Sequence, residues 1–133
     1  NVETFSHFKP LTEEKISFLQ EMADLMEDYP TIPCTACTYC MPCPYGIDIP
    51  TIFRHYNDAV NAGDIAQSHE QKDFQRLKRR YLVSYDRAVA TVRQADHCIG
   101  CGQCKSHCPQ SIDIPRMLHR IDAYIEKLRR ETL

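Results

Sequence analysis

Eight cysteines in a chain of 133 residues fall into two short blocks. The first block is Cys34-x2-Cys37-x2-Cys40-x2-Cys43, and the second is Cys98-x2-Cys101-x2-Cys104-x3-Cys108. Three thiolates spaced two residues apart can reach three corners of one inorganic core from a single loop, while a fourth comes from farther along the chain. Because each block ends in Cys-Pro, the chain can turn away from the core after the last cysteine. The spacing therefore predicts two [4Fe–4S] clusters.

Two other uses of clustered cysteines fit the spacing less well. Structural zinc sites usually join two separated C-x2-C pairs rather than a tight run of four cysteines. A disulfide framework suits an oxidising compartment, and residues 1–7 show neither the basic nor the apolar region of a signal peptide. We therefore expect reduced thiols, a cytoplasmic location and bound metal.

The second block resembles the run of two-cluster bacterial ferredoxins, in which the fourth cysteine binds the other cluster. This resemblance implies one cluster on Cys34, Cys37, Cys40 and Cys108, and another on Cys98, Cys101, Cys104 and Cys43. The first block departs from the run, since two residues rather than three precede its fourth cysteine. A local set of Cys34, Cys37, Cys40 and Cys43 is therefore the alternative.

An internal repeat favours two equivalent sites. Residues 43–50 (CPYGIDIP) and 108–115 (CPQSIDIP) agree at six of eight positions. Apolar residues then follow with the same helical spacing, at 49, 52, 53 and 56 and at 114, 117, 118 and 121. Asp48 and Asp113 are expected to be N-caps, with Pro50 and Pro115 in the first turn. The sequence thus predicts twice a cysteine loop that leads into a capped helix.

The rest of the chain is also expected to be helical. A helix is predicted from Thr12 to Asp28, with residues 16, 19, 23 and 26 on one apolar face. Further helices are predicted over residues 49–62, 64–83 and 115–130, and residues 84–95 favour helix over a short strand at 88–92. We therefore expect an all-α domain over residues 12–133, behind a linker of residues 1–11. Because the cysteine loops contain few apolar residues, removal of metal is predicted to unfold this domain.

Composition limits the possible partners. Sixteen basic and eighteen acidic residues give a formal charge of −2, and bound clusters would make it more negative, so nucleic acid is not an expected partner. No apolar run is long enough to span a membrane. The basic stretch of residues 72–80 is expected to be a solvated helix face, with a docking site for an acidic partner as the alternative.

Other polar residues near the cysteines are given lesser roles. His97 and His107 each precede a cysteine, but with eight thiols present they are expected to be solvated or to donate hydrogen bonds rather than to bind metal. Tyr39 and Tyr45 are expected to shield a cluster from water. The sequence contains no phosphate-binding glycine loop and no Ser/His/Asp set, so no catalytic residue is predicted.

The separation of the two blocks resembles that of α-helical ferredoxins. Fifty-four residues lie between Cys43 and Cys98, more than in compact β-rich bacterial ferredoxins. Helical dicluster domains occur in fumarate reductase iron–sulfur subunits and in dihydropyrimidine dehydrogenase. The resemblance implies two pseudo-symmetric cysteine loop–helix units around two clusters.

A closer resemblance lies in residues 33–50, PCTACTYCMPCPYGIDIP, and in residues 98–104 and 107–110. These segments are similar to the C-terminal ferredoxin-like extension of bacterial aldo/keto reductase-family oxidoreductases, in which the short spacer of the first block is characteristic. Residues 8–12 resemble the linker that leaves the barrel in those proteins.

This resemblance implies a longer parent chain with an upstream catalytic barrel. NADPH would bind only in that barrel, and a redox partner protein or domain would exchange electrons with the clusters. The absence of an initiator methionine also suggests a piece of a longer protein. Two alternatives to this electron-transfer module remain: clusters that only stabilise a small helical domain, and a stand-alone iron–sulfur subunit of a respiratory or heterodisulfide-type complex.

Overall fold

The computed structural model describes residues 2–6, 9–27 and 29–133, in two compact units, Asn1–Pro30 and Thr31–Leu133. The helices are α1 (Val2–Ser6), α2 (Glu13–Glu27), α3 (Ile49–Asn61), α4 (Phe74–Ala88) and α5 (Ile114–Arg130). Three short 3₁₀ turns are η1 (Thr91–Arg93), η2 (Ala95–His97) and η3 (Lys105–His107). These described residues form no strand, which confirms the all-α prediction and excludes the strand considered at 88–92.

The first unit contains the helix expected after Thr12. Glu13 and Glu14 lie in the first turn of α2, where the helix dipole favours negative charge. The predicted last residue, Asp28, lies outside the described residues. The predicted apolar face is solvent-exposed, since Ile16, Leu19 and Met26 expose 45%, 52% and 78% of their surface. The expected domain boundary at residues 11 and 12 stays a prediction.

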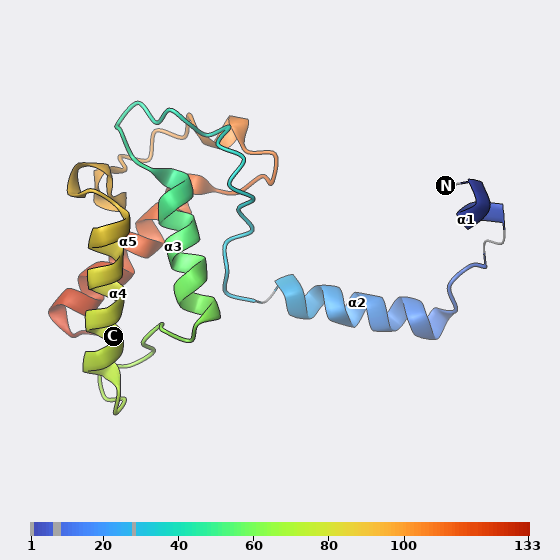
Figure 1. Ribbon diagram of the computed structural model, residues 1–133, viewed down its shortest axis with the longest axis horizontal. Helices are drawn as coiled ribbons and strands as arrows, with labels where there is room; N and C mark the ends of the chain where they lie inside the picture. Colours follow the sequence, from blue (N-terminus) through green and yellow to red (C-terminus); the bar gives the residue numbers. More distant parts are fainter. Residues whose placement is uncertain (1, 7–8, 28) are drawn as a thin grey trace. The chain divides into compact units, whose positions relative to one another are not determined.

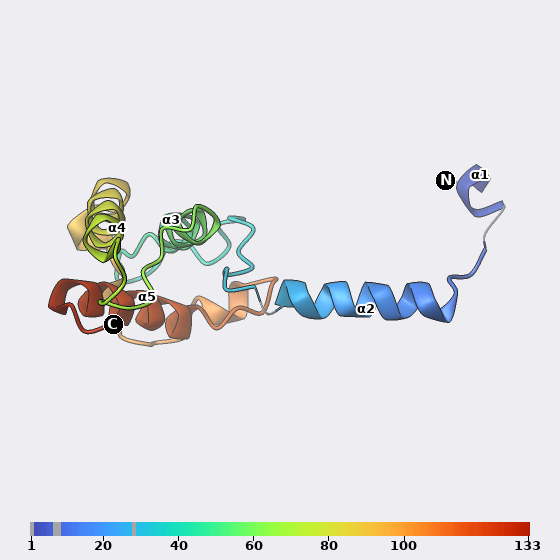
Figure 2. The ribbon, with the colours of Figure 1, turned by 90° about the horizontal axis from the view of Figure 1, so that it is seen from below.

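Three helices form the core of the second unit. Figures 1 and 2 show α3, α4 and α5 packed beside one another. The apolar stripes of the repeat supply two sides of this core: Ile49, Ile52, Phe53 and Tyr56 from α3, and Ile114, Leu118 and Ile121 from α5, are all buried. The third side comes from Phe74, Leu77, Tyr81 and Tyr85 of α4. Nowhere in the described ranges is a helix long and apolar enough to cross a membrane.

The two repeat helices begin at the predicted aspartate caps. Asp48 accepts a hydrogen bond from the backbone N–H of Thr51, and Asp113 accepts one from the N–H of Arg116, each over 3.4 Å. A proline lies in the first turn of both helices, where its missing N–H costs no hydrogen bond. Because each cap follows a cysteine loop, the caps fix how each loop enters its helix.

The predicted helix over residues 64–83 is only partly correct. Residues 64–73 are not helical, and α4 begins at Phe74. Buried Asp64 pairs with Arg80 at 2.9 Å, and the N–H of Ala66 donates to the Tyr124 hydroxyl at 2.9 Å. These contacts with distant residues hold the segment in an irregular conformation. The helix favoured after residue 83 is found as far as Ala88.

Tyr81 offers a test of this core. Its side chain is 1% exposed, and its hydroxyl has no hydrogen-bond partner within the described part of the chain. An unsatisfied buried polar group costs about 1–3 kcal/mol. We expect Tyr81→Phe to retain the edge-on ring contact with Tyr124 and to raise the free energy of unfolding by about 1 kcal/mol, measured by chemical unfolding. The matched control is Tyr124→Phe, which loses the bond to Ala66 and should be destabilised. A destabilised Tyr81→Phe variant would show that the hydroxyl is hydrogen-bonded.

Candidate metal centres

The two cysteine blocks form loops that precede α3 and α5. Figures 1 and 2 show these loops together at one end of the helical core of the second unit. Six of the eight thiol residues are partly buried, and the other two, Cys37 and Cys101, are exposed. Each loop therefore has a covered side and one cysteine at the surface.

One pocket is lined by cysteines from both blocks. Cys34, Cys37 and Cys40 of the first block line it together with Cys108 of the second. Apolar side chains complete the lining, among them Phe53, which is fully buried in the core. Burial raises the pKa of the Cys40 thiol, and the neighbouring Cys34, Cys37 and Cys108 raise it further. The fold thus brings these four thiols to one place.

The other four thiols gather around Cys104. Burial raises the pKa of the Cys104 thiol to about 11, and the nearby Cys101, Cys43 and Cys98 also raise it. Cys43 belongs to the first block, so this group combines both blocks as well. The eight cysteines therefore form two groups of four, each with three members from one block and the last cysteine of the other.

The two loops share an unusual backbone conformation at matching positions. In the first loop φ is +53° at Ala36 and +64° at Thr38; in the second it is +75° at both Gly100 and Gly102. Such values place these residues in the left-handed region, which glycine adopts easily and β-branched residues rarely adopt. Changes of handedness between neighbouring residues turn successive N–H groups toward one point and create anion-binding concavities, including those of iron–sulfur sites.

The turn after each fourth cysteine is also repeated. The N–H of Gly46 donates to the carbonyl of Cys43 at 2.9 Å, and the N–H of Ser111 donates to that of Cys108 at 3.1 Å. Both Gly46 and Ser111 have positive φ, +77° and +53°. The repeat seen in the sequence is therefore a repeat of backbone conformation, although each copy has a residue other than glycine at one or more of these positive-φ positions.

Each group has the number of thiols that one four-iron cube needs. In a tetrahedral zinc site each sulfur lies about 2.3 Å from the metal, which places neighbouring sulfurs roughly 3.8 Å apart. Within residues 2–6, 9–27 and 29–133, no three His, Cys, Asp or Glu side chains are close enough to hold a single ion. Two groups of four thiols supply the one thiolate that each iron of two four-iron cubes takes.

The residues given lesser roles lie around these loops. His97 directs Nε2 to the carbonyl of Thr91 at 3.0 Å, and His107 is exposed. Tyr39 and Tyr45 expose 68% and 46% of their surface. The role predicted for the tyrosines as shields against water therefore stays a prediction.

Two supporting side chains were not predicted. Asn57 donates to the carbonyl of Ile32 at 2.7 Å and accepts from its N–H at 2.8 Å, so it fixes the backbone just before Cys34. His119 places Nε2 3.1 Å from the carbonyl of Cys98. Both act over more than twenty residues of sequence, and no local pattern marks either of them.

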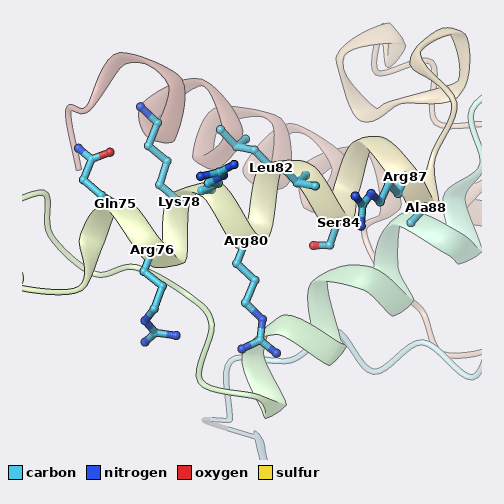
Figure 3. Close-up of a pocket in the computed structure, with 10 residues that line it drawn as sticks. Gln75, Arg76, Lys78, Arg80, Leu82, Ser84, Arg87 and Ala88 are labelled. Carbon is cyan, nitrogen blue, oxygen red and sulfur yellow. The ribbon is translucent and has the colours of Figure 1, made fainter.

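The basic stretch of the sequence lies largely on the outer face of α4, shown in Figure 3. Three of its cations are paired: Arg76 with Asp73 at 2.8 Å, Lys78 with Glu131 at 2.7 Å and Arg80 with Asp64 at 2.9 Å. The hollow on this face is lined by side chains of α4 itself, so it is the space between long side chains and not a cleft between elements. These pairs favour the solvated helix face, and docking of an acidic partner stays a prediction.

Comparison with known families agrees with the cysteine geometry. A family model described as a 4Fe-4S dicluster domain matches residues 33–112, a span that contains all eight cysteines and more than half of the chain. Neither the curated proteins nor the solved structures gave a match. With two groups of four thiols inside the matched span, the chain belongs to the 4Fe-4S dicluster domain family and is an iron–sulfur protein of the ferredoxin type.

Proposed function

We propose that the chain holds its two [4Fe–4S] clusters by crossed ligation and passes electrons between a redox partner and a catalytic domain. One cluster would take Cys34, Cys37, Cys40 and Cys108, and the other Cys98, Cys101, Cys104 and Cys43. The observation that carries this assignment is the pocket lined by three thiols of the first block and the fourth thiol of the second. The influence of Cys43 on the Cys104 thiol supports the complementary group.

The protein environment suits electron transfer. Each cluster supplies a site that gains or loses a single electron, at a potential that burial and hydrogen bonds to sulfur adjust. Apolar residues such as Phe53 and Ile112 line the first group and limit access of water. Cys37 and Cys101 are exposed, so one corner of each group lies where a partner can approach.

The proposed setting is the C-terminal module of an aldo/keto reductase-like oxidoreductase in the cytoplasm, with NADPH bound in an upstream domain. The resemblance of residues 33–50 and 98–104 to such extensions supports this setting. In this setting the upstream domain would carry out the carbonyl chemistry, and residues 1–133 would only carry electrons. The coding sequence upstream of Asn1 tests the setting. A barrel is expected there, whereas a start codon directly before Asn1 would favour a stand-alone subunit.

Metal analysis tests the core of the proposal. Chain purified without oxygen should contain about eight iron and eight sulfide per molecule, and after reduction it should show the EPR signals of two [4Fe–4S] clusters. About two zinc atoms per chain, with no EPR signal, would contradict it. Reduction potentials far outside the cellular range would instead favour clusters that only stabilise the fold.

A further inference from the structure

We infer that Arg93 is a positioning residue that joins the two halves of the second thiol group. Arg93 precedes Cys98 in the sequence, and its side chain contacts the segment that follows Cys43. This inference rests on the proposed crossed ligation, because only then do Cys43 and Cys98 serve the same cluster.

Three contacts tie Arg93 to the segment that follows Cys43. The Nε of Arg93 donates to the carbonyl of Gly46 at 3.2 Å, and its guanidinium lies 3.7 Å from the carboxylate of Asp48. The N–H of Asp48 in turn donates to the carbonyl of Arg93 at 3.1 Å. Gly46 also closes the turn on the Cys43 carbonyl. Arg93 therefore acts one hydrogen bond away from the backbone of a proposed ligand.

The segment that follows Arg93 is held by hydrogen bonds to the helical core. Gln94 is 5% exposed, and its amide donates to the carbonyl of Val89 and to Asp86, each at 3.1 Å. The N–H of Ala95 donates to the buried Tyr85 hydroxyl at 3.0 Å, and the N–H of Cys98 donates to the carbonyl of Ala95 at 3.0 Å. The backbone from Arg93 to Cys98 is thus fixed to the helical core.

Among the described residues, the second repeat shows no equivalent link between the blocks. Its cap, Asp113, pairs at 3.0 Å with Lys105, a residue of the same block. The cap of the first repeat, Asp48, instead pairs with an arginine from the other half of the domain. Since Arg93 is 47% exposed, its ion pair contributes little to global stability. Its effect should therefore appear in the placement of Cys43 and not in the folding of the helices.

The test compares Arg93→Gln and Arg93→Lys with Arg87→Gln, which removes an exposed arginine on α4. All are made in the full chain and loaded without oxygen. In Arg93→Gln a chelator should remove the cluster of the Cys98 group at least fivefold faster than in wild type, while helical circular dichroism stays unchanged. The lost EPR signal should be the one that Cys98→Ser also lacks. Arg93→Lys should give an intermediate rate, and Arg87→Gln should match wild type.

The reduction potential gives a second, independent measurement. Loss of the guanidinium charge in Arg93→Gln should make the potential of the same cluster more negative, while Arg93→Lys retains most of the wild-type value and the other cluster is unaffected. Equal loss of both clusters, or wild-type rates and potentials in Arg93→Gln, would overturn the positioning role while leaving the proposed function intact. A wild-type chain without clusters would overturn both.

Discussion

Cys43→Ser should eliminate the cluster of the second cysteine block and leave that of the first. Cys43 lies near enough to Cys104 to raise the pKa of its thiol, as Cys98 and Cys101 do, and a serine hydroxyl is a poor substitute for a thiolate ligand of iron. The iron content should fall from about eight toward about four per chain. EPR should then show a single remaining signal.

The matched variants identify which cluster is lost. Under crossed ligation Cys43→Ser should lose the same EPR signal as Cys101→Ser, while Cys108→Ser should lose the same signal as Cys37→Ser. Under local ligation the partners exchange, so Cys43→Ser would resemble Cys37→Ser. The comparison needs no prior assignment of either signal. A Cys43→Ser variant that matches Cys37→Ser would refute the crossed arrangement.

The two repeat helices could be predicted because their signals are local. An aspartate, a proline two residues later and an apolar residue every three or four positions define both the start and the buried face of a helix. These signals depend on neighbours in the chain, and the structure follows them from Ile49 and from Ile114. The exception is Met117, which is only partly buried.

The prediction for residues 64–73 was wrong because their conformation depends on distant residues. The segment 64–73 has no strong helix breaker at its centre, yet Asp64 pairs with Arg80 and Ala66 binds the hydroxyl of Tyr124. By contrast, the helix predicted after Thr12 depends on local spacing, and α2 is found there from Glu13.

In the candidate site, too, local sequence predicts some features, and contacts between distant residues determine the others. Cysteine type and spacing predict the chemistry, since few metal groups need four thiolates from so short a run. The grouping across blocks requires the fold, which brings Cys108 to the pocket of the first block. The supports behind the ligands, Asn57 and Arg93, are ordinary polar residues in the sequence, and only their contacts with Ile32 and Gly46 reveal their roles.

Removal of iron should release the cysteine loops but leave the three-helix core folded. The sequence alone predicts wider unfolding, because the loops contain little apolar surface and metal binding couples to folding. In the structure, however, α3, α4 and α5 contribute Ile52, Leu77 and Leu118 to one buried hydrophobic cluster. Hydrophobic burial on this scale holds helices together without metal.

We therefore expect the apo chain to keep most of its helical circular dichroism, to melt at a lower temperature and to lose hydrogen-exchange protection in residues 33–47 and 99–113. The left-handed backbone at Ala36 and Thr38, which costs about 1–2 kcal/mol per residue, adds a reason for the first loop to relax once its ligand is removed. Replacing Leu118 by alanine in the apo chain should then abolish the remaining transition, because a buried leucine contributes about 2–5 kcal/mol. An apo chain with no helical signal and no cooperative melt would show instead that the clusters hold the whole domain together.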